Sequence, residues 1–430
     1  MIDPKMLIDQ TQALMPAPVW FVQFFKALGF TLHTVPMNLW YAGLLIALWL
    51  HLRGSEQGRR FAARLLQQMP IIVAVGINLG IVPLLFIQLA YYKVFYPATI
   101  LMAWFWLGII VLLIPAYYGV YAYAWGLRRL ATDEASIPGN PRHRETPPNC
   151  NGGALGSGKD LSEPALAPWQ KVAGWCAALF FICIGFTFAN GLSLMEHVQR
   201  WPELWNAHNV AGAATGAALN VGDPTLWPRW LLMFGLALGT TAVWVLVDAV
   251  WLTRGTTDEA YQRWAWGFAK KLYTFGMLWA AAAGSWYVFH TWPAGLRYTM
   301  FQWPLIVLTI ATAVAPGLPW LLMMTAGLCS AKRATGDCPN FRPSENGTVP
   351  FGTRAIVAVI ALCQFAVLGV NATSRQIVQN INLERFVNVS AQPTDVQWGP
   401  LWMFLIAFVL GLGVVGWMIA QIVKCKPKNG

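Results

Sequence analysis

Charged residues are scarce in this sequence. Asp, Glu, Lys and Arg make up 11% of its 430 residues, whereas hydrophobic residues make up 57%. A soluble domain carries roughly 25% charged residues, so the composition excludes an ordinary soluble protein and predicts a polytopic protein of the lipid bilayer. The 24 Trp and 12 Tyr fit aromatic belts at the two membrane–water interfaces.

Motifs that would indicate several common chemistries are also missing. The seven cysteines form no C-x-x-C pair, which excludes a dithiol redox motif and the C-x-x-C-H attachment site of c-type haem. No H-E-x-x-H motif is present, so zinc-dependent hydrolysis has no support. The opening MIDPKMLIDQTQALMPAP has no basic stretch followed by an apolar run, and no cleavable signal peptide is expected.

Long apolar runs occupy most of the chain. Crossing a hydrocarbon core takes about 20 residues, and a lone chain in lipid must bond its backbone within helices or a closed barrel. These runs are too long and too uniformly apolar for barrel strands, so we predict an all-α integral membrane protein with about nine transmembrane helices. The spans are expected at 22–51, 69–91, 98–126, 170–195, 229–253, 268–290, 303–327, 353–374 and 399–423.

Basic residues alternate from one side of the predicted bundle to the other. Lys and Arg are concentrated in the connections after the first, third, fifth and seventh spans and in the tail, and the other connections carry one or two each. Cytoplasmic connections are rich in Lys and Arg, so the N-terminus is predicted outside and the C-terminus inside, in a bacterial inner membrane. The net charge of +11 then reflects topology, and no nucleic-acid partner is expected.

Two of the connections are long. Residues 130–168 are rich in Pro, Gly, Ser and charge, and we predict a flexible cytoplasmic linker there. It would separate a first membrane part of three spans, residues 1–129, from a second part of six spans, residues 169–430. Residues 197–228 are predicted to form an outer loop that lies on the membrane surface or docks a partner.

Carboxylates are nearly absent from the apolar runs. Asp248, in WVLVDAVW, is the only one well inside a span, and we expect it to pair with Arg254 or another basic side chain at the cytoplasmic end. A proton relay would need several carboxylates at different depths. The sequence also contains no internal repeat of fixed period, which counts against a repeat-built transporter.

Four of the six histidines are predicted at the outer membrane face. His33 lies near the outer end of the first span, His197 and His290 close the fourth and sixth spans, and His208 lies in the outer loop. Imidazole is the usual axial ligand of b-type haem and needs no cysteine. Hydrogen bonding to interfacial water is the alternative for the last three. His33 is deeper in its span and is the first candidate for a haem ligand.

Several short motifs resemble subunit I of the cytochrome bd quinol oxidases. The first span of that family begins with an outer-side histidine, which His33 in ALGFTLHTVPMNLWYAG matches. Residues 76–78 (GIN) match a Gly-Ile-Asn triplet in the second span, and residues 374–376 (SRQ) are similar to a Gly-Arg-Gln element in the eighth. The count of nine spans and the outer N-terminus also agree. The resemblance implies the same fold, with Arg375 beside a haem propionate.

The chain departs from this family where the resemblance would place oxidase chemistry. Gln88 is the only polar candidate where the family's second span has a glutamate, and residues 371–373 (NAT) replace a haem-ligating glutamate. The histidine expected in the fifth span is absent, although Met233 lies nearby. In the short loop TWPAGLRYTMFQ, Arg297 and Met300 are only faintly similar to the family's Arg and ligand Met. Oxygen reduction is therefore not expected.

Three functions remain open. The first is a haem-b-binding subunit of a respiratory oxidoreductase complex, which passes electrons between the quinone pool or a partner subunit and a periplasmic c-type cytochrome. Its one haem b would be held by His33, with Met300, His290 or His197 as second ligand and Arg375 at a propionate. The second is a haem-free membrane anchor for redox subunits. The third is a transporter, which the sequence favours least.

Overall fold

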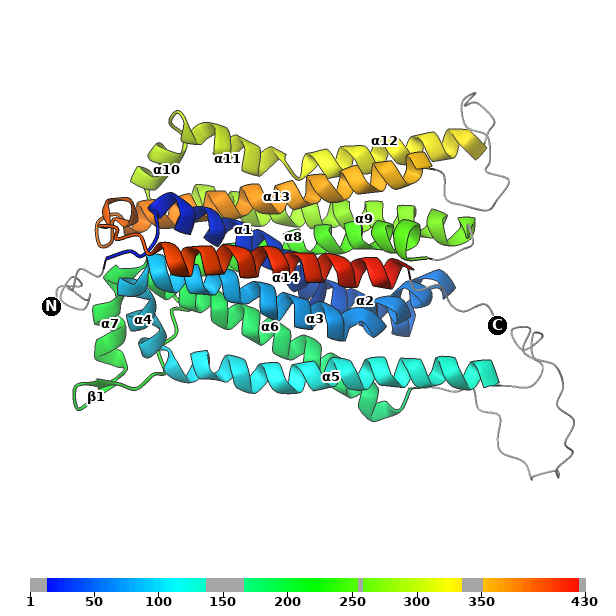
Figure 1. Ribbon diagram of the computed structural model, residues 1–430, viewed down its shortest axis with the longest axis horizontal. Coiled ribbons are helices and arrows are strands. Elements are labelled where there is room, and N and C mark those ends of the chain that lie inside the picture. The colour runs from blue at the N-terminus through cyan, green and yellow to red at the C-terminus, as the bar shows by residue number, and fades with distance from the viewer. Residues whose placement is uncertain (1–13, 137–165, 254–257, 335–350, 425–430) are drawn as a thin grey trace, which may run out of the picture.

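The computed structural model describes residues 14–136, 166–253, 258–334 and 351–424. Almost all of them are helical, and the helices run along one long axis in a single bundle (Figure 1). The predicted all-α membrane fold is thus confirmed. Most of the predicted linker, residues 137–165, lies outside the described residues.

The first span is one continuous helix with a wider turn inside it. Helix α1 (Val19–Asn38) passes through the π-helical turn η2 (Leu39–Gly43) into α2 (Leu44–Arg53). The other elements are, in chain order, α3 (Glu56–Ala90), α4 (Tyr92–Leu101), α5 (Ala103–Ser136), α6 (Pro168–Glu196), η4 (Val198–Arg200), α7 (Trp201–Ala207), β1 (Asn209–Val210), β2 (Ala213–Ala214), α8 (Leu226–Val247), η5 (Asp248–Leu252), α9 (Glu259–Ser285), η6 (Trp286–Thr291), α10 (Ala294–Met300), α11 (Leu305–Val314), α12 (Gly317–Ala334), α13 (Phe351–Leu383), η7 (Val389–Ala391) and α14 (Trp398–Lys424).

Eight helices of the described residues are long and apolar enough to cross a membrane. They coincide with eight of the nine predicted spans. The remaining one, 268–290, is also helical, since α9 continues into η6, but Lys270 and Lys271 make its first turns less apolar. Helix α1 begins at one end of the bundle and α14 ends at the other (Figure 1), as an odd number of passes requires.

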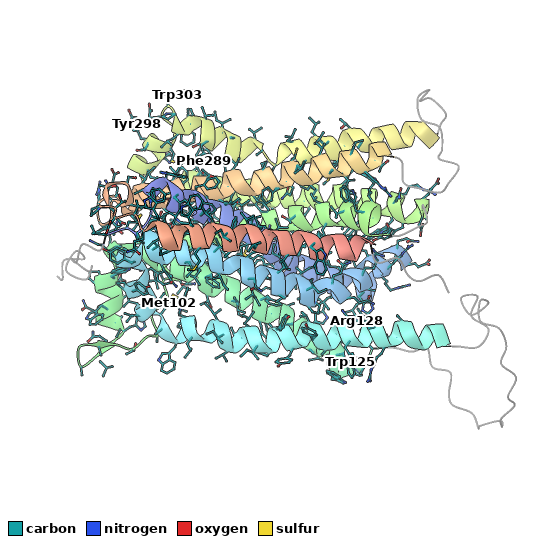
Figure 2. All side chains as sticks on the ribbon, in the orientation of Figure 1. Met102, Trp125, Arg128, Phe289, Tyr298 and Trp303 are labelled. Atoms are coloured by element: carbon teal, nitrogen blue, oxygen red, sulfur yellow. The ribbon has the colours of Figure 1, made fainter. Side chains whose placement is uncertain are left out.

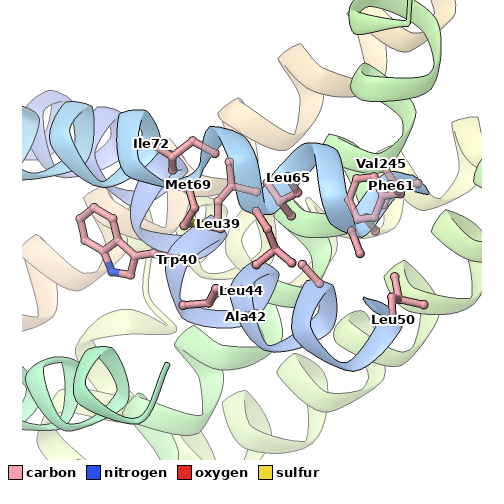
Figure 3. Packing of buried hydrophobic residues seen from close by; sticks show 14 of the residues in the cluster. Leu39, Trp40, Ala42, Leu44, Leu50, Phe61, Leu65, Met69, Ile72 and Val245 are labelled. Carbon is pink, nitrogen blue, oxygen red and sulfur yellow. The ribbon is translucent and has the colours of Figure 1, made fainter. Parts of the chain in front are cut away.

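The largest buried core lies where the first span packs against α3 and α8 (Figure 3). Leu39, Leu44 and Leu65 are each only 1% exposed there. Lipid gives apolar helices no hydrophobic drive to associate, so such packing depends on close approach of the backbones. Gly235 of α8 and Gly276 of α9 allow this approach, because a Cβ on either one would lie 2.9 Å from the other's carbonyl oxygen.

Large apolar side chains stand out from the outer helices, where lipid would surround them (Figure 2). Trp303 and Tyr298 are 80% and 69% exposed at the end of the bundle where α10 lies. Trp125 of α5 lies toward the other end and carries the guanidinium of Arg129 over its ring, 3.6 Å from the centroid. Aromatic residues therefore stand at both ends, as interfacial belts require.

The buried carboxylate of Asp248 is paired, as the sequence predicts. Arg64 of α3 donates from Nε to both carboxylate oxygens, at 3.0 and 3.1 Å, and the hydroxyl of Tyr261 donates to Oδ2 at 2.6 Å. The partner is thus a basic side chain of the connection after the first span; Arg254 lies outside the described residues. This network joins α3, η5 and α9.

The predicted outer loop, 197–228, packs on its own chain. It contains η4, α7 and the two-stranded β1–β2 hairpin. The backbone N–H of Ala218 donates to the carbonyl of Leu101 at 2.9 Å, and that of Trp104 donates to Gly216 at 3.0 Å. The loop therefore covers the junction of α4 and α5 at one end of the bundle.

Candidate functional site

His33 lies on the face of α1 that packs against α3. Its Nδ1 is 2.8 Å from the carbonyl oxygen of Gly76. Its ring lies against Gly80, where a Cβ would come within 2.9 Å of Nδ1, and it meets the ring of Trp40 edge to face, 5.8 Å between centroids. The same Gly76 leaves room for Trp40, because a Cβ at that position would collide with the indole. Gly76 and Gly80, one turn apart in α3, thus form the backbone surface that the imidazole contacts.

The contact with Gly76 determines which nitrogen of His33 carries the proton. A carbonyl oxygen only accepts hydrogen bonds, so Nδ1 is the donor and Nε2 keeps its lone pair. A histidine that ligates a metal through Nε2 is held in this way by a hydrogen bond from its other nitrogen. His33 stands fourteen positions after Val19, the first residue of α1, which is about 21 Å along the helix.

The other predicted ligands are held in separate places. His290 is exposed in η6. Met300 is fully buried in a small apolar cluster with Tyr287 and Trp292. His197 follows the end of α6 and belongs to a polar network. No hydrogen bond, ion pair or ring contact among the described residues joins any of them to His33, and no group of three His, Cys, Asp or Glu residues there could hold a metal ion.

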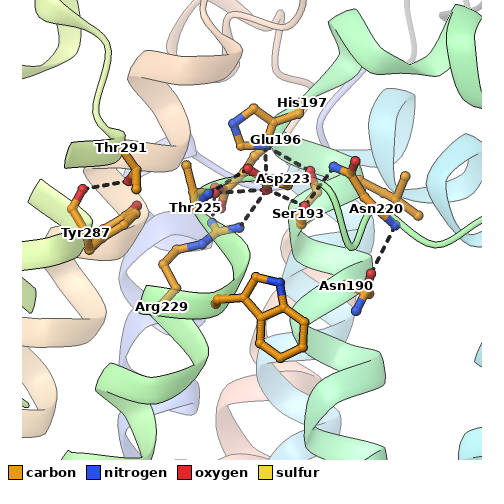
Figure 4. A network of polar contacts seen from close by, with 12 residues as sticks. Asn190, Ser193, Glu196, His197, Asn220, Asp223, Thr225, Arg229, Tyr287 and Thr291 are labelled. Atoms are coloured by element: carbon orange, nitrogen blue, oxygen red, sulfur yellow. Dashed lines mark hydrogen bonds and ion pairs between the residues drawn. The ribbon is translucent and has the colours of Figure 1, made fainter. Parts of the chain in front are cut away.

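Asp223 is the centre of the polar network beyond α6 (Figure 4). Its carboxylate is 1% exposed and accepts from His197 Nδ1 at 3.1 Å, from the backbone N–H of Thr225 at 2.8 Å and from the hydroxyl of Ser193. Burial by itself would raise the pKa of Asp223, but the hydrogen bonds outweigh it and hold that pKa well below its usual value.

His197 responds to the same network in the opposite direction. Burial by itself would lower the pKa of the imidazole, but the hydrogen bond to Asp223 and the charges of Asp223 and Glu196 raise it above its usual value. Glu196 forms an ion pair with Arg229 of α8. The sequence gives one local signal for this network, the Asp-Pro-Thr turn before α8, but it does not reveal that His197 is the partner.

A second polar cluster lies one to two turns of α1 before His33. Nζ of Lys26 donates to Oε1 of Gln379 at 2.6 Å and lies 4.2 Å over the ring of Tyr91. Nη1 of Arg375 donates to Sδ of Met233 at 3.2 Å, and its guanidinium lies 5.0 Å over the ring of Phe30. Lys26 and Arg375 both line a cavity of about 50 Å³.

Lys26 was missed by the sequence reasoning, although a lysine inside the apolar run FVQFFKALGF is a signal in its own right. Ionisable side chains inside a membrane span are costly and commonly functional. Lys26 is only 6% exposed, so its ammonium group depends on the partners that the fold provides.

The predicted haem fits these residues in its donor chemistry. His33 offers one nitrogen ligand in the correct tautomer, and Lys26 and Arg375 supply positive charge toward the N-terminal end of α1, where propionates would need a counter-charge. Among the predicted second ligands, His197 is hydrogen-bonded to Asp223, His290 is exposed and Met300 is buried in an apolar cluster. The cavity beside Lys26 is far smaller than the roughly 300–1,000 Å³ of ligand pockets. It has room for a carboxylate and not for a macrocycle.

Comparison with known proteins extends to the whole fold. No protein-family model matches the sequence, and no curated protein matches it either. Among solved structures, the bd oxidase from Geobacillus thermodenitrificans is similar with a TM-score of 0.59, over 96% of this chain and 100% of that chain, at 12% identity. An identity this low shows the fold alone. The chain therefore has the fold of a bd oxidase, as a remote structural relative of the kind that the short motifs in its sequence predict.

Proposed function

We propose that this chain is a membrane subunit of a respiratory electron-transfer complex and holds one haem b through His33. The observation that carries the proposal is the hydrogen bond from His33 Nδ1 to the Gly76 carbonyl, which leaves Nε2 free to ligate iron. The fold similarity supports the setting, because the solved structure that the chain resembles is a bd oxidase.

Different residues of this chain would contact different parts of the haem. His33 would supply the axial nitrogen, and Gly76 and Gly80 hold its ring in place. Arg375 would offset the charge of a propionate, as the sequence resemblance implies. A bound haem b would supply one-electron transfer. Met300, His290 and His197 stay the candidates for a second ligand.

The proposed setting is a bacterial inner membrane, with the N-terminus outside and the C-terminus in the cytoplasm. The electrons would pass between the quinone pool or a partner subunit and a periplasmic c-type cytochrome. The proposed function does not include reduction of oxygen, because Asp248 is engaged by Arg64 and Tyr261 and the predicted spans contain no series of carboxylates that could carry protons.

A haem-free membrane anchor for redox subunits is the second candidate, and one observation favours it. The His33 ring is packed between Gly80 and Trp40, and the nearby cavity holds only about 50 Å³. In that case the His33–Gly76 hydrogen bond serves to join α1 to α3, since polar contacts hold helices together in lipid.

The test is a dithionite-reduced minus oxidised visible spectrum of the purified full-length protein. His33→Ala is compared with His51→Ala, a matched change at the other end of the same span, where His51 Nδ1 lies 2.7 Å from the Tyr123 hydroxyl. We expect haem-b bands in the wild type and in His51→Ala and their loss in His33→Ala. Bands that survive in His33→Ala would assign the haem to another ligand. A wild type without bands would favour the anchor.

A further inference from the structure

Lys26 is buried and Arg375 partly buried, and neither has a carboxylate partner among the described residues. Neither Lys26 nor Arg375 has a carboxylate oxygen within 4.0 Å among the described residues, and the ion pairs there involve other basic side chains. The contacts that they do have are to an amide oxygen, a thioether sulfur and two aromatic rings. None of these carries a negative charge, although burial of a charge is costly unless it is paired.

The surroundings of the cavity leave an excess of positive charge. Glu196 lines the cavity, but it is already ion-paired with Arg229. Arg229 also lies 3.8 Å from Asp223. These two carboxylates stand against three basic side chains, Arg229, Lys26 and Arg375, so when all three are protonated one positive charge is unbalanced even with His197 neutral. A single negative charge in the cavity would balance it.

Gln379 lines the cavity, and its side chain has a buried hydrogen-bond donor without a partner among the described residues. Gln379 is 4% exposed, and its Oε1 accepts from Lys26, so its amide orientation is determined and its Nε2 points to no acceptor. Gln376 lines the same cavity with its Oε1 unpartnered, while its Nε2 donates to the carbonyl of Gln23. Buried donors and acceptors are nearly always satisfied in folded proteins. An acceptor bound in the cavity would satisfy Gln379 Nε2, and a water molecule beside it would satisfy Gln376 Oε1.

We propose that this cavity binds a carboxylate group, which accepts from Lys26 Nζ, the Arg375 guanidinium and Gln379 Nε2. A volume of about 50 Å³ suits one carboxylate or a small number of waters, since a cavity needs roughly 10–15 Å³ of such volume to hold one water. The carboxylate has two sources: a propionate of the haem, in which case the inference rests on the proposed function, or a small monocarboxylate from the outer solution.

The experiment compares Lys26→Met with Lys93→Met, a matched change at a partly exposed lysine of α4. The full-length protein is purified in detergent, and its haem content is measured first. For haem-free protein the probe is sodium acetate against sodium chloride at equal ionic strength, and the readout is the midpoint of thermal unfolding. For haem-loaded protein the readout is the reduction potential of the haem.

In haem-free protein we expect acetate to raise the unfolding midpoint of the wild type and of Lys93→Met with saturation. Lys26→Met should weaken the apparent acetate affinity at least tenfold. In haem-loaded protein we expect acetate to be without effect and Lys26→Met to lower the reduction potential, because a propionate would lose its counter-charge. The first result identifies a free carboxylate and the second a propionate. Absence of haem alone therefore refutes only the proposed function.

The carboxylate site is overturned if acetate acts no better than chloride on haem-free protein, or if Lys26→Met and Lys93→Met behave alike in either arm. A second variant, Gln379→Leu, keeps both cations and removes only the donor, so it serves if Lys26→Met does not fold. It should weaken acetate binding or shift the potential in the same direction by a smaller amount, and unchanged behaviour would count against the site.

Discussion

The close contact between the His33 ring and Gly80 predicts the effect of adding one methyl group at position 80. In Gly80→Ala, the new Cβ would lie 2.8 Å from Cε1 and 2.9 Å from Nδ1 of His33. Both distances are shorter than ordinary contacts, so the imidazole must move away from α3 and its hydrogen bond to Gly76 must lengthen. The perturbation therefore acts on His33 without changing His33 itself.

The magnitude follows from three opposing contributions. Overpacking of a tight contact costs roughly 1–3 kcal/mol, and loss of the hydrogen bond adds about 1 kcal/mol. Replacing Gly by Ala within a helix returns roughly 0.5–1 kcal/mol. We expect Gly80→Ala to lower the free energy of unfolding by roughly 1–3 kcal/mol. Gly108→Ala in α5 is the matched control, because a Cβ there has no neighbour within 4 Å and only the helix contribution remains.

The assay is reversible unfolding of both variants in mixed detergent micelles, together with the reduced-minus-oxidised spectrum. Gly80→Ala should be less stable than the wild type and should lose or shift any haem-b bands, whereas Gly108→Ala should be at least as stable as the wild type with unchanged bands. If Gly80→Ala and Gly108→Ala have equal stability, His33 is not packed against Gly80, and the expected displacement of the imidazole is refuted.

Two further predictions concern charged pairs. The pKa of His197 is raised, so the stabilisation from its charged form is complete below the ordinary value of 6.5 and is lost as the pH rises through the raised pKa. The pKa of Asp223 is lowered, so the stabilisation from its carboxylate is complete above the ordinary value of 3.8 and is lost as the pH falls through the lowered pKa. Unfolding midpoints should therefore peak between these two ordinary values, and His197→Gln should flatten the alkaline side; an unchanged pH profile would refute the pairing. Arg64→Met leaves Asp248 buried without its cation and should cost about 3–5 kcal/mol. Measured by the same unfolding assay, Arg64→Met with Asp248→Leu should recover most of that loss, and a double variant no more stable than Arg64→Met would contradict the account.

Apolar run length is a good guide to the part of a helix that lies in lipid and a poor guide to the whole helix. The second span was predicted to begin at residue 69, but α3 begins at Glu56, directly after the capping hydroxyl of Ser55, which accepts from the N–H of Gly58. The added turns carry Arg60 and Arg64, whose charges lower the apolar average. They are helical because they pack and pair at the end of the bundle.

The fold class, eight of the nine spans and the pairing of Asp248 with a basic side chain followed from the sequence, because the bilayer imposes length, apolarity and charge placement on every segment separately. Contacts between segments did not follow. Lys26 and Gln379 are 353 positions apart, and His197 meets Asp223 across the outer loop. Only the packing of the helices decides which polar groups face each other, since an apolar run is compatible with many rotations about its axis. For His33, the sequence identified the residue as a candidate ligand. The packing of α3 against α1 then determined that Nδ1 is hydrogen-bonded and that Nε2 keeps its lone pair.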